Sequence, residues 1–447
     1  MRVLFIIAMR NLVQARRRTL LLSTAIGLVT AMLVLLLSMS AGISDNLVKS
    51  ATTLSSGHVV VGGFFKPSPT QAVPLLSEAG ALRAIIEKET PGLDHVVARG
   101  RGWGKIVGPG GSVQSALSGV TLSDEPGFAT SLQLAAQKEY KDGGSDKVLG
   151  DANRLSEPNS IILFAGHAKR LEVDVGDIVT IVAEENDGRT NTLDVTIVAI
   201  ARDLGMLSGW TSLVNEEAIR KLQKLNADTT GAFWVYLKDI DDSKPAMEAL
   251  RESLKAHGYQ VMDYQPVPFW MKFETVGGED WTGQKLDLTI WEDEVSFLTY
   301  AVTAFNGLTV FVASILLIII AIGISNTMFN TVRERTREIG TMRAIGLQKY
   351  AVLRLFMLEA VLLGLFATTS GSLIGAAAAI GLDAMHFPVP IAAMSAFLLS
   401  DTIHFTVQPT SLLGSVGFLT TCTALAALWP SFRAARLRPI VALGYAA

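Results

Sequence analysis

Residues 333–346 have the sequence RERTREIGTMRAIG, and this stretch decides how the rest of the chain is interpreted. Its arginines and glutamates follow one another at helical spacing, and Gly346 ends the run. Opposite charges three or four residues apart stabilise a short exposed helix. About 14 residues would make a helical rod of about 21 Å. Because a long apolar segment lies on each side, we predict a charged helical connection between two membrane spans.

Four apolar segments are long enough to cross a bilayer, which takes about 20 residues. The composition, 49% hydrophobic and 18% charged, suits a few spans together with one large water-exposed domain. A signal peptide is the alternative for the first segment, because Arg16, Arg17 and Arg18 precede it, but its length favours a retained anchor. The predicted spans are residues 19–43, 297–330, 351–382 and 410–430.

The basic residues predict the orientation of these spans, because loops on the cytosolic side are enriched in Lys and Arg. Basic residues gather in an entry helix at 1–18, in the connection at 331–350 and in the tail at 431–447, whereas the loop at 383–409 has none. We therefore expect both termini and the 331–350 connection to lie in the cytosol. Residues 44–296 then form an extracytoplasmic, periplasmic domain.

This outer segment is acidic and has mixed secondary-structure signals. It holds 24 of the 38 basic and 36 of the 41 acidic residues, a net charge of −12, which argues against binding to nucleic acid or anionic lipid. Alternating and helical patterns predict an α+β domain, a porter-like lobe interrupted by an inserted β-rich lobe. Helices are expected at 77–90, 165–171, 216–225 and 243–257, and strands at 57–61, 94–107, 113–122, 178–182, 192–201, 233–237 and 259–264. We interpret residues 273–296, with Trp281 and Trp291, as a polar-aromatic approach to the second span whose tryptophans anchor at the membrane interface.

The sequence carries no recognisable enzyme motif. A GxxxxGK[ST] phosphate loop, an HExxH pair and a GxSxG turn are all absent, so the chain does not bind ATP by the phosphate-loop route. The six histidines lack metal-ligand spacing, and the single cysteine, Cys422, allows no internal disulfide. We predict neither catalytic residues nor a metal site.

Two features inside the third span have both a structural and a functional interpretation. Glu359 is the ionisable residue within this span, which is by default a candidate functional site, but Arg354 nearby favours structural pairing. Gly371 and Gly375 form a GxxxG pattern that would let another helix pack closely.

Several separated motifs resemble the FtsX-like permease superfamily of ABC transporters, the group that contains MacB and the lipoprotein-releasing permeases LolC and LolE. Residues 8–12 (AMRNL) and 18–21 (RTLL) resemble the entry helix, and residues 333–346 resemble the coupling helix. Residues 430–443 (PSFRAARLRPIVAL) resemble the C-terminal motif, and residues 168–180 (AKRLEVDVGDIVT) resemble the core of the outer domain. Together the motifs extend over nearly the whole chain.

The resemblance implies a permease that is not itself an ATPase. Such permeases pair with a second copy or a paralogue and dock onto a dimer of cytosolic ATPase subunits, which use ATP and Mg²⁺; no cofactor is bound by this chain. ATP-driven closure is then passed along the helices to the outer domain, which is mechanotransmission. The predicted ATPase-coupling residues are Arg333, Glu334, Arg337, Glu338, Gly340, Arg343 and Gly346.

The substrate has three candidate classes. Only about 18 residues precede the first span, which favours a stand-alone permease similar to LolC and LolE and hence extraction of lipoproteins from the inner membrane, with a periplasmic lipoprotein chaperone as partner. The alternatives are MacB-like efflux of peptides or amphiphiles through an adaptor protein, and a signalling permease that controls a cell-wall hydrolase. Lipid anchors would enter at the outward ends of the first two spans, at Met39, Ile43, Leu47, Val48, Phe297, Tyr300 and Phe305.

Overall fold

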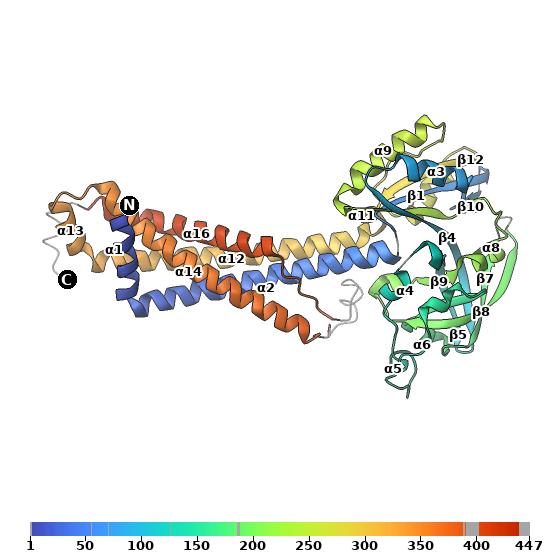
Figure 1. Cartoon of the computed structure of the whole chain (residues 1–447), viewed down its shortest axis with the longest axis horizontal. Coiled ribbons are helices and arrows are strands. Elements are labelled where there is room, and N and C mark those ends of the chain that lie inside the picture. Colours follow the sequence, from blue (N-terminus) through green and yellow to red (C-terminus); the bar gives the residue numbers. More distant parts are fainter. Residues whose placement is uncertain are drawn as a thin grey trace. The chain divides into compact units, whose positions relative to one another are not determined.

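The computed structural model describes residues 2–54, 56–69, 71–125, 127–185, 188–387, 389 and 402–437. These residues fall into two compact units (Figure 1). The membrane unit comprises Met1–Asp45, Val302–Pro388 and Thr402–Ala447, and the sheet unit comprises Asn46–Ala301 and Val389–Asp401. Residues 438–443 of the predicted C-terminal motif, and residues 388 and 390–401 of the predicted loop at 383–409, lie outside the described residues.

The membrane unit consists of helices, and the four longest carry few charges along their length. The helices are α1 (Arg2–Gln14), α2 (Arg16–Leu54), α12 (Ser296–Glu334), α13 (Thr336–Ala344), α14 (Lys349–Ala384) and α16 (Pro409–Ala435). Among them, α2, α12, α14 and α16 are long and apolar enough to cross a membrane, and they lie over the four predicted spans. Their shared core includes Ile26, Ile324, Phe356 and Ala427.

Small residues let α2 and α14 approach closely. A Cβ atom on Gly371 would lie 2.2 Å from the backbone oxygen of Gly27, and one on Gly375 would lie 2.7 Å from that of Ala31. The predicted packing role of Gly371 and Gly375 is therefore confirmed, and α2 is the helix that packs against them.

The first lobe of the sheet unit is an antiparallel sheet covered by two helices. Its strands lie in the order β12 (Gly283–Ile290), β1 (Val59–Ser68), β11 (Ala232–Leu237) and β4 (Leu93–Gly108). The helices α3 (Ala79–Glu89) and α9 (Ser243–Ala256) bury Leu82, Ile86, Met247 and Leu250 against the sheet. The short strands β2 (Gln71–Val73), β3 (Leu76–Ser77) and β10 (Thr229–Thr230) flank it.

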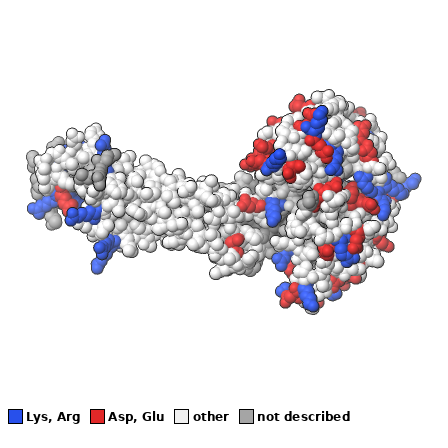
Figure 2. Space-filling view, viewed as in Figure 1, with Lys and Arg blue, Asp and Glu red and all other residues white. Residues whose placement is uncertain are grey.

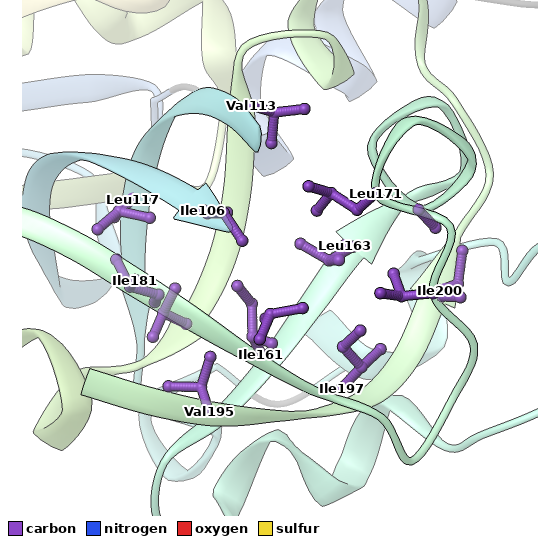
Figure 3. Packing of buried hydrophobic residues seen from close by; sticks show 14 of the residues in the cluster. Ile106, Val113, Leu117, Ile161, Leu163, Leu171, Ile181, Val195, Ile197 and Ile200 are labelled. Carbon is purple, nitrogen blue, oxygen red and sulfur yellow. The ribbon is translucent and has the colours of Figure 1, made fainter. Parts of the chain in front are cut away.

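The second lobe is inserted into the first and is a closed ring of strands. The ring runs from β4 through β5 (Gly111–Val120), β9 (Thr211–Asn215), β6 (Ser160–Phe164), β8 (Thr190–Ala201) and β7 (Ile178–Glu184), and β7 pairs with β4 again. Figure 3 shows side chains such as Ile106, Leu163 and Ile197 filling its interior. Closure leaves no free edge between these strands, so the lobe presents fewer unpaired backbone groups than an open sheet would.

Strand β4 belongs to both lobes. Its first half pairs with β11 and its second half pairs with β5. The N–H of Gly100 donates a hydrogen bond of 2.9 Å to the carboxylate of Glu216, at the start of α8 (Glu216–Gln223), and a Cβ atom at Gly100 would displace this side chain. The other short helices of this unit are α4 (Phe128–Ser131), α5 (Gln137–Tyr140), α6 (Ala165–Leu171), α7 (Gly205–Ser208), α10 (Phe273–Gly278) and α11 (Trp291–Glu294), with 3-10 turns at Leu122–Asp124, Ala152–Ser156, Ile240–Asp242 and Phe269–Lys272.

The predicted fold class, apolar membrane helices with a large α+β domain made of an interrupted lobe and an inserted lobe, is confirmed. The predicted strand at 259–264 is wrong, because Val261 makes only an isolated bridge to Leu286. Pro266 and Pro268 follow directly, and they lack the N–H groups that a longer ladder needs.

The interpretation of residues 273–296 also needs correction. Strand β12 occupies much of this segment, where it pairs with β1 along its whole length. The ring nitrogen of Trp281 donates a hydrogen bond to Glu279, and the amines of Lys66 and Lys285 lie 5.1 and 4.8 Å from its ring centre. Trp281 is therefore part of the packing of the sheet unit rather than a membrane anchor.

Candidate functional site

The charged connection consists of two helices that meet at Arg335. Helix α12 ends at Glu334 and α13 begins at Thr336, and between them Arg335 has φ −100° and ψ 12°, outside helical geometry. The prediction of a single helix over 333–346 is therefore wrong. The side chain of Arg335 turns inward at this break, where its Nη1 lies 3.3 Å from Oε1 of Glu359.

Most of the predicted coupling residues lie on the exposed side of this connection. Arg333, Glu334, Arg337, Glu338 and Gly346 are exposed. Figure 2 shows charged side chains gathered at this end of the membrane unit, while the sides of its helices carry almost none. We define the coupling surface as Arg333, Glu334, Arg337, Glu338, Ile345 and Gly346.

Ile345 and Gly346 form the end of this surface. Ile345 was not predicted from the sequence, yet its side chain is 82% exposed. Gly346 has φ +106°, a left-handed conformation that favours glycine. Its N–H donates a hydrogen bond to the backbone carbonyl oxygen of Arg343, and the N–H of Leu347 donates to that of Met342. These bonds end α13 and leave an apolar side chain beside the charges.

Two predicted coupling residues face the interior instead. Gly340 is buried next to Ile339, so it does not offer a partner close approach. The Nη1 group of Arg343 donates hydrogen bonds to the carbonyl oxygens of Ala435 and Leu437, at 3.0 and 2.8 Å. Arg343 therefore caps the C-terminal end of α16, where a cation is favourable.

Glu359 has different partners from the one expected. Its carboxylate accepts hydrogen bonds from Asn11 of α1 and from Arg335. Arg354, the predicted partner, is exposed. Neither contact was foreseeable from local spacing, because Arg335 and Asn11 belong to other helices.

The structure brings together part of the predicted lipid-entry set. The hydroxyl of Ser40 donates to Asn306, so α2 and α12 lie side by side at the level of Met39 and Phe305. Ile43 and Leu47 are buried, Tyr300 is exposed, and Met39, Val48, Phe297 and Phe305 are half-buried. The set is therefore not one continuous exposed patch, and a lipid entry there stays a prediction.

The sheet unit contains a buried cluster of charges just before α12. Lys272 and Asp287 form an ion pair of 2.7 Å and are almost fully buried. Burial raises the pKa of the Glu294 carboxyl, which accepts a hydrogen bond from Thr289. Burial also raises the pKa of Asp293, which accepts from the hydroxyl of Tyr264. Among the described residues no group of three or more His, Cys, Asp or Glu is placed to hold a metal ion.

The comparison with known families gives a match for the second half of the membrane unit. Residues 310–439 match the model of the FtsX-like permease C-terminal family, which covers the end of α12, the coupling surface, α14 and α16. Together with four helices that are apolar and long enough to span, this match indicates a multi-pass membrane protein.

Individual relatives agree with this assignment. An uncharacterised ABC transporter permease of Methanocaldococcus jannaschii is 24% identical over 446 residues, which is 98% of this chain and 96% of that protein. The macrolide export ATP-binding/permease protein MacB of Nitrobacter winogradskyi is 36% identical over 132 residues, 30% of this chain. The chain spans only 18% of the length of that MacB protein. The resemblance noted in the sequence is confirmed at this level: residues 310–439 match the FtsX-like permease C-terminal family, and the chain is similar to ABC transporter permeases.

A likeness to a solved structure was also found for part of the chain. The extracellular domain of the ABC-type transporter YknZ from Gram-positive bacteria is 16% identical, with a TM-score of 0.28, and the match covers 44% of this chain and 95% of that domain.

Proposed function

We propose that this chain is the permease subunit of an ABC transporter. A separate ATPase subunit binds to the coupling surface, and the movement driven by ATP hydrolysis is transmitted to the permease there. One observation carries the proposal: the exposed charged helix α13 follows α12 after a single residue. A partner that moves α13 therefore acts directly on the end of a long helix. ATP and Mg²⁺ belong to the partner subunit in this proposal.

The length of α12 supports mechanical transmission. Its 39 residues rise about 58 Å, nearly twice the hydrocarbon thickness of about 30 Å. Its first residues, up to 301, belong to the sheet unit, and the rest belong to the membrane unit. Helix α2 has the same length and is likewise divided between the units. Two helices thus connect the coupling end of the membrane unit with the sheet unit, without an intervening loop.

The orientation and the assembly follow from the same proposal. The arginine-rich ends and the coupling surface face the cytosol, where the ATPase subunits are, and the acidic sheet unit lies on the opposite side. A second permease copy or a paralogue completes the complex, so that each permease offers one coupling surface to a dimer of ATPase subunits.

The test removes charge from the coupling surface without touching the interior. We expect the double variant Arg337→Gln/Glu338→Gln to lose co-purification of the ATPase subunit about tenfold, since exposed ion pairs across an interface mainly set recognition. Arg343 is unsuitable for this test because it caps α16. The matched control is Lys244→Gln/Glu248→Gln, which removes two exposed opposite charges from α9. Equal ATPase binding by the coupling variant and the control contradicts the proposal.

If the protein transports a substrate, that substrate belongs to one of two amphiphilic classes. The resemblance of the entry and outer-domain motifs to the lipoprotein-releasing permeases favours release of lipoproteins from the membrane. The similarity to a protein named for macrolide export favours efflux of small amphiphiles through an adaptor. Depletion of the protein separates them: mislocalised lipoproteins support release, and normal lipoproteins with raised sensitivity to amphiphilic toxins support efflux. If neither changes and cell-wall hydrolysis falls, the permease is a signalling one.

A further inference from the structure

The carboxylate of Glu359 joins three helices of the membrane unit. It lies on α14, it accepts hydrogen bonds from Asn11 of α1, and it pairs with Arg335 at the break between α12 and α13. Glu359 is buried and only 17% of the Arg335 side chain is exposed. The contact therefore sits inside the helix bundle, immediately beneath the coupling surface.

A buried ion pair at this place needs an explanation other than stability. Well-packed apolar side chains often stabilise a protein as much as a buried ion pair does. Ionisable side chains within membrane segments are rare and usually functional. The pair restricts the orientation of the chain at Arg335, because the planar guanidinium of Arg335 can meet the carboxylate in only a few orientations.

The far end of α13 is held in a comparable way. Arg343 donates to carbonyl oxygens at the end of α16 (Ala435) and just beyond it (Leu437), so the two ends of this nine-residue helix are tied to two different spans. Arg335 ties the first end to Glu359 of α14, whose carboxylate also accepts a hydrogen bond from Asn11 of α1. The apolar contacts of Ile339 lie between these two attachments. Because it is held at both ends, α13 cannot turn about Arg335 without breaking a charged contact.

We propose that Glu359 is a positioning residue for energy coupling: it fixes the break at Arg335 against α1 and α14, so that movement imposed on α13 passes into the spans instead of being lost as rotation at the break. This inference rests on the proposed function, since it assumes that an ATPase subunit moves α13. It assigns ATPase recognition to the coupling surface and transmission to the buried pair beneath it.

The first experiment removes the negative charge of Glu359 and keeps the size of its side chain. Glu359→Gln keeps an oxygen that can accept from Asn11 and loses the charge that meets Arg335. In proteoliposomes with the cognate ATPase subunit, we expect unchanged binding of that subunit and a loss of permease-dependent ATPase stimulation of about tenfold, within the usual range of coupling between sites. The matched control is Arg354→Gln, which removes an exposed charge from the same helix and should keep full stimulation.

A second variant separates positioning from folding. Arg335→Leu/Glu359→Leu replaces the pair by apolar side chains, which should preserve the thermal stability and the ATPase binding of the complex. A spin label attached through Thr341→Cys, on the exposed side of α13 and in a Cys422→Ser background, should then show a broader range of orientations than the same label in the protein that keeps Arg335 and Glu359.

The outcomes are distinct. Loss of stimulation with retained binding and a broadened label distribution supports the inference. Native stimulation by the Leu/Leu variant overturns it, since the pair would then be only structural. If the unaltered permease neither binds nor stimulates any ATPase subunit, the proposed function itself fails, whatever the variants do.

Discussion

The two units of this protein use buried charge differently. The sheet unit buries the ion pairs of Lys272 with Asp287 and of Arg99 with Glu125 in its interior. The membrane unit packs its spans mainly through apolar and small residues, and it places the pair of Arg335 and Glu359 at the end that carries the coupling surface.

The difference shows what buried charge contributes in each place. In the sheet unit Arg99 lies between the rings of Phe128 and Trp234, at 4.7 and 4.3 Å, and so joins segments from both lobes. Such pairs fix the packing of irregular segments around the strands. In the membrane unit the regular helices already determine the packing. The pair of Arg335 and Glu359 is needed only where the orientation of α13 relative to α12 must be fixed.

The largest effect that tests this comparison is expected at Lys272. Lys272→Met leaves Asp287 buried without its partner, which typically costs about 3–5 kcal/mol. We expect early thermal unfolding of the sheet unit, measured on the full-length protein in detergent by tryptophan fluorescence. The double variant Lys272→Met/Asp287→Leu should recover most of the stability, because no uncompensated charge remains.

The matched control for this prediction is Lys244→Met on the exposed side of α9. It makes the same chemical change in the same unit and should leave the unfolding temperature nearly unchanged. If Lys272→Met is as mild as this control, the buried pair does not determine the packing of the sheet unit.

A smaller effect is expected from packing in the membrane unit. Gly371→Leu would force apart α2 and α14, because even a Cβ atom would lie 2.2 Å from the oxygen of Gly27. Overpacking of this kind typically costs about 1–3 kcal/mol. Gly381→Leu, on the same helix with no atom within 4 Å of its Cβ position, is the control. Equal thermal stability of the two variants in detergent would show that close approach is not what holds these spans together.

The parts of the fold that depend on local pattern were predictable. A run of apolar residues fixes the position of a span, as in α14, and alternating residues mark strands such as β7 and β8. The exposed positions of Arg337 and Glu338 follow from the same local rules. The sequence analysis does not predict strand β12, because it lies between a glycine-rich stretch and a helix. Its residues are interpreted there as part of the approach to the second span.

The parts that depend on tertiary contacts were not predictable. The partners of Glu359 come from α1 and from the break after α12, and no spacing in the sequence connects them. The same holds for Arg343, whose capping of α16 joins residues more than 90 positions apart. The exposure of Ile345 depends on which face of α13 packs against the other helices, and the local sequence does not determine this face.

The smallest predicted effect concerns pH and the sheet unit. Burial lowers the pKa of His58, and the nearby His95 lowers it further. The neutral ring is needed because its Nδ1 accepts a hydrogen bond from the N–H of Leu237 at 3.0 Å. An unfolded chain binds a proton at this histidine near pH 6.5, whereas the folded protein does so only at lower pH. Stability should therefore fall as the pH drops below about 6.5 and should level off below the folded pKa.

His58→Asn removes this dependence, since an amide oxygen can accept the same hydrogen bond without titrating. We expect the difference in unfolding free energy between the native protein and this variant to change by less than about 1 kcal/mol between pH 7.5 and 5, because the half-exposed ring is partly screened. His257→Asn, at the exposed end of α9, is the control. A pH dependence that is identical with and without His58 would mean that its ring is not held neutral by the fold, and that the titrating charges of this unit lie in the buried carboxylates before α12.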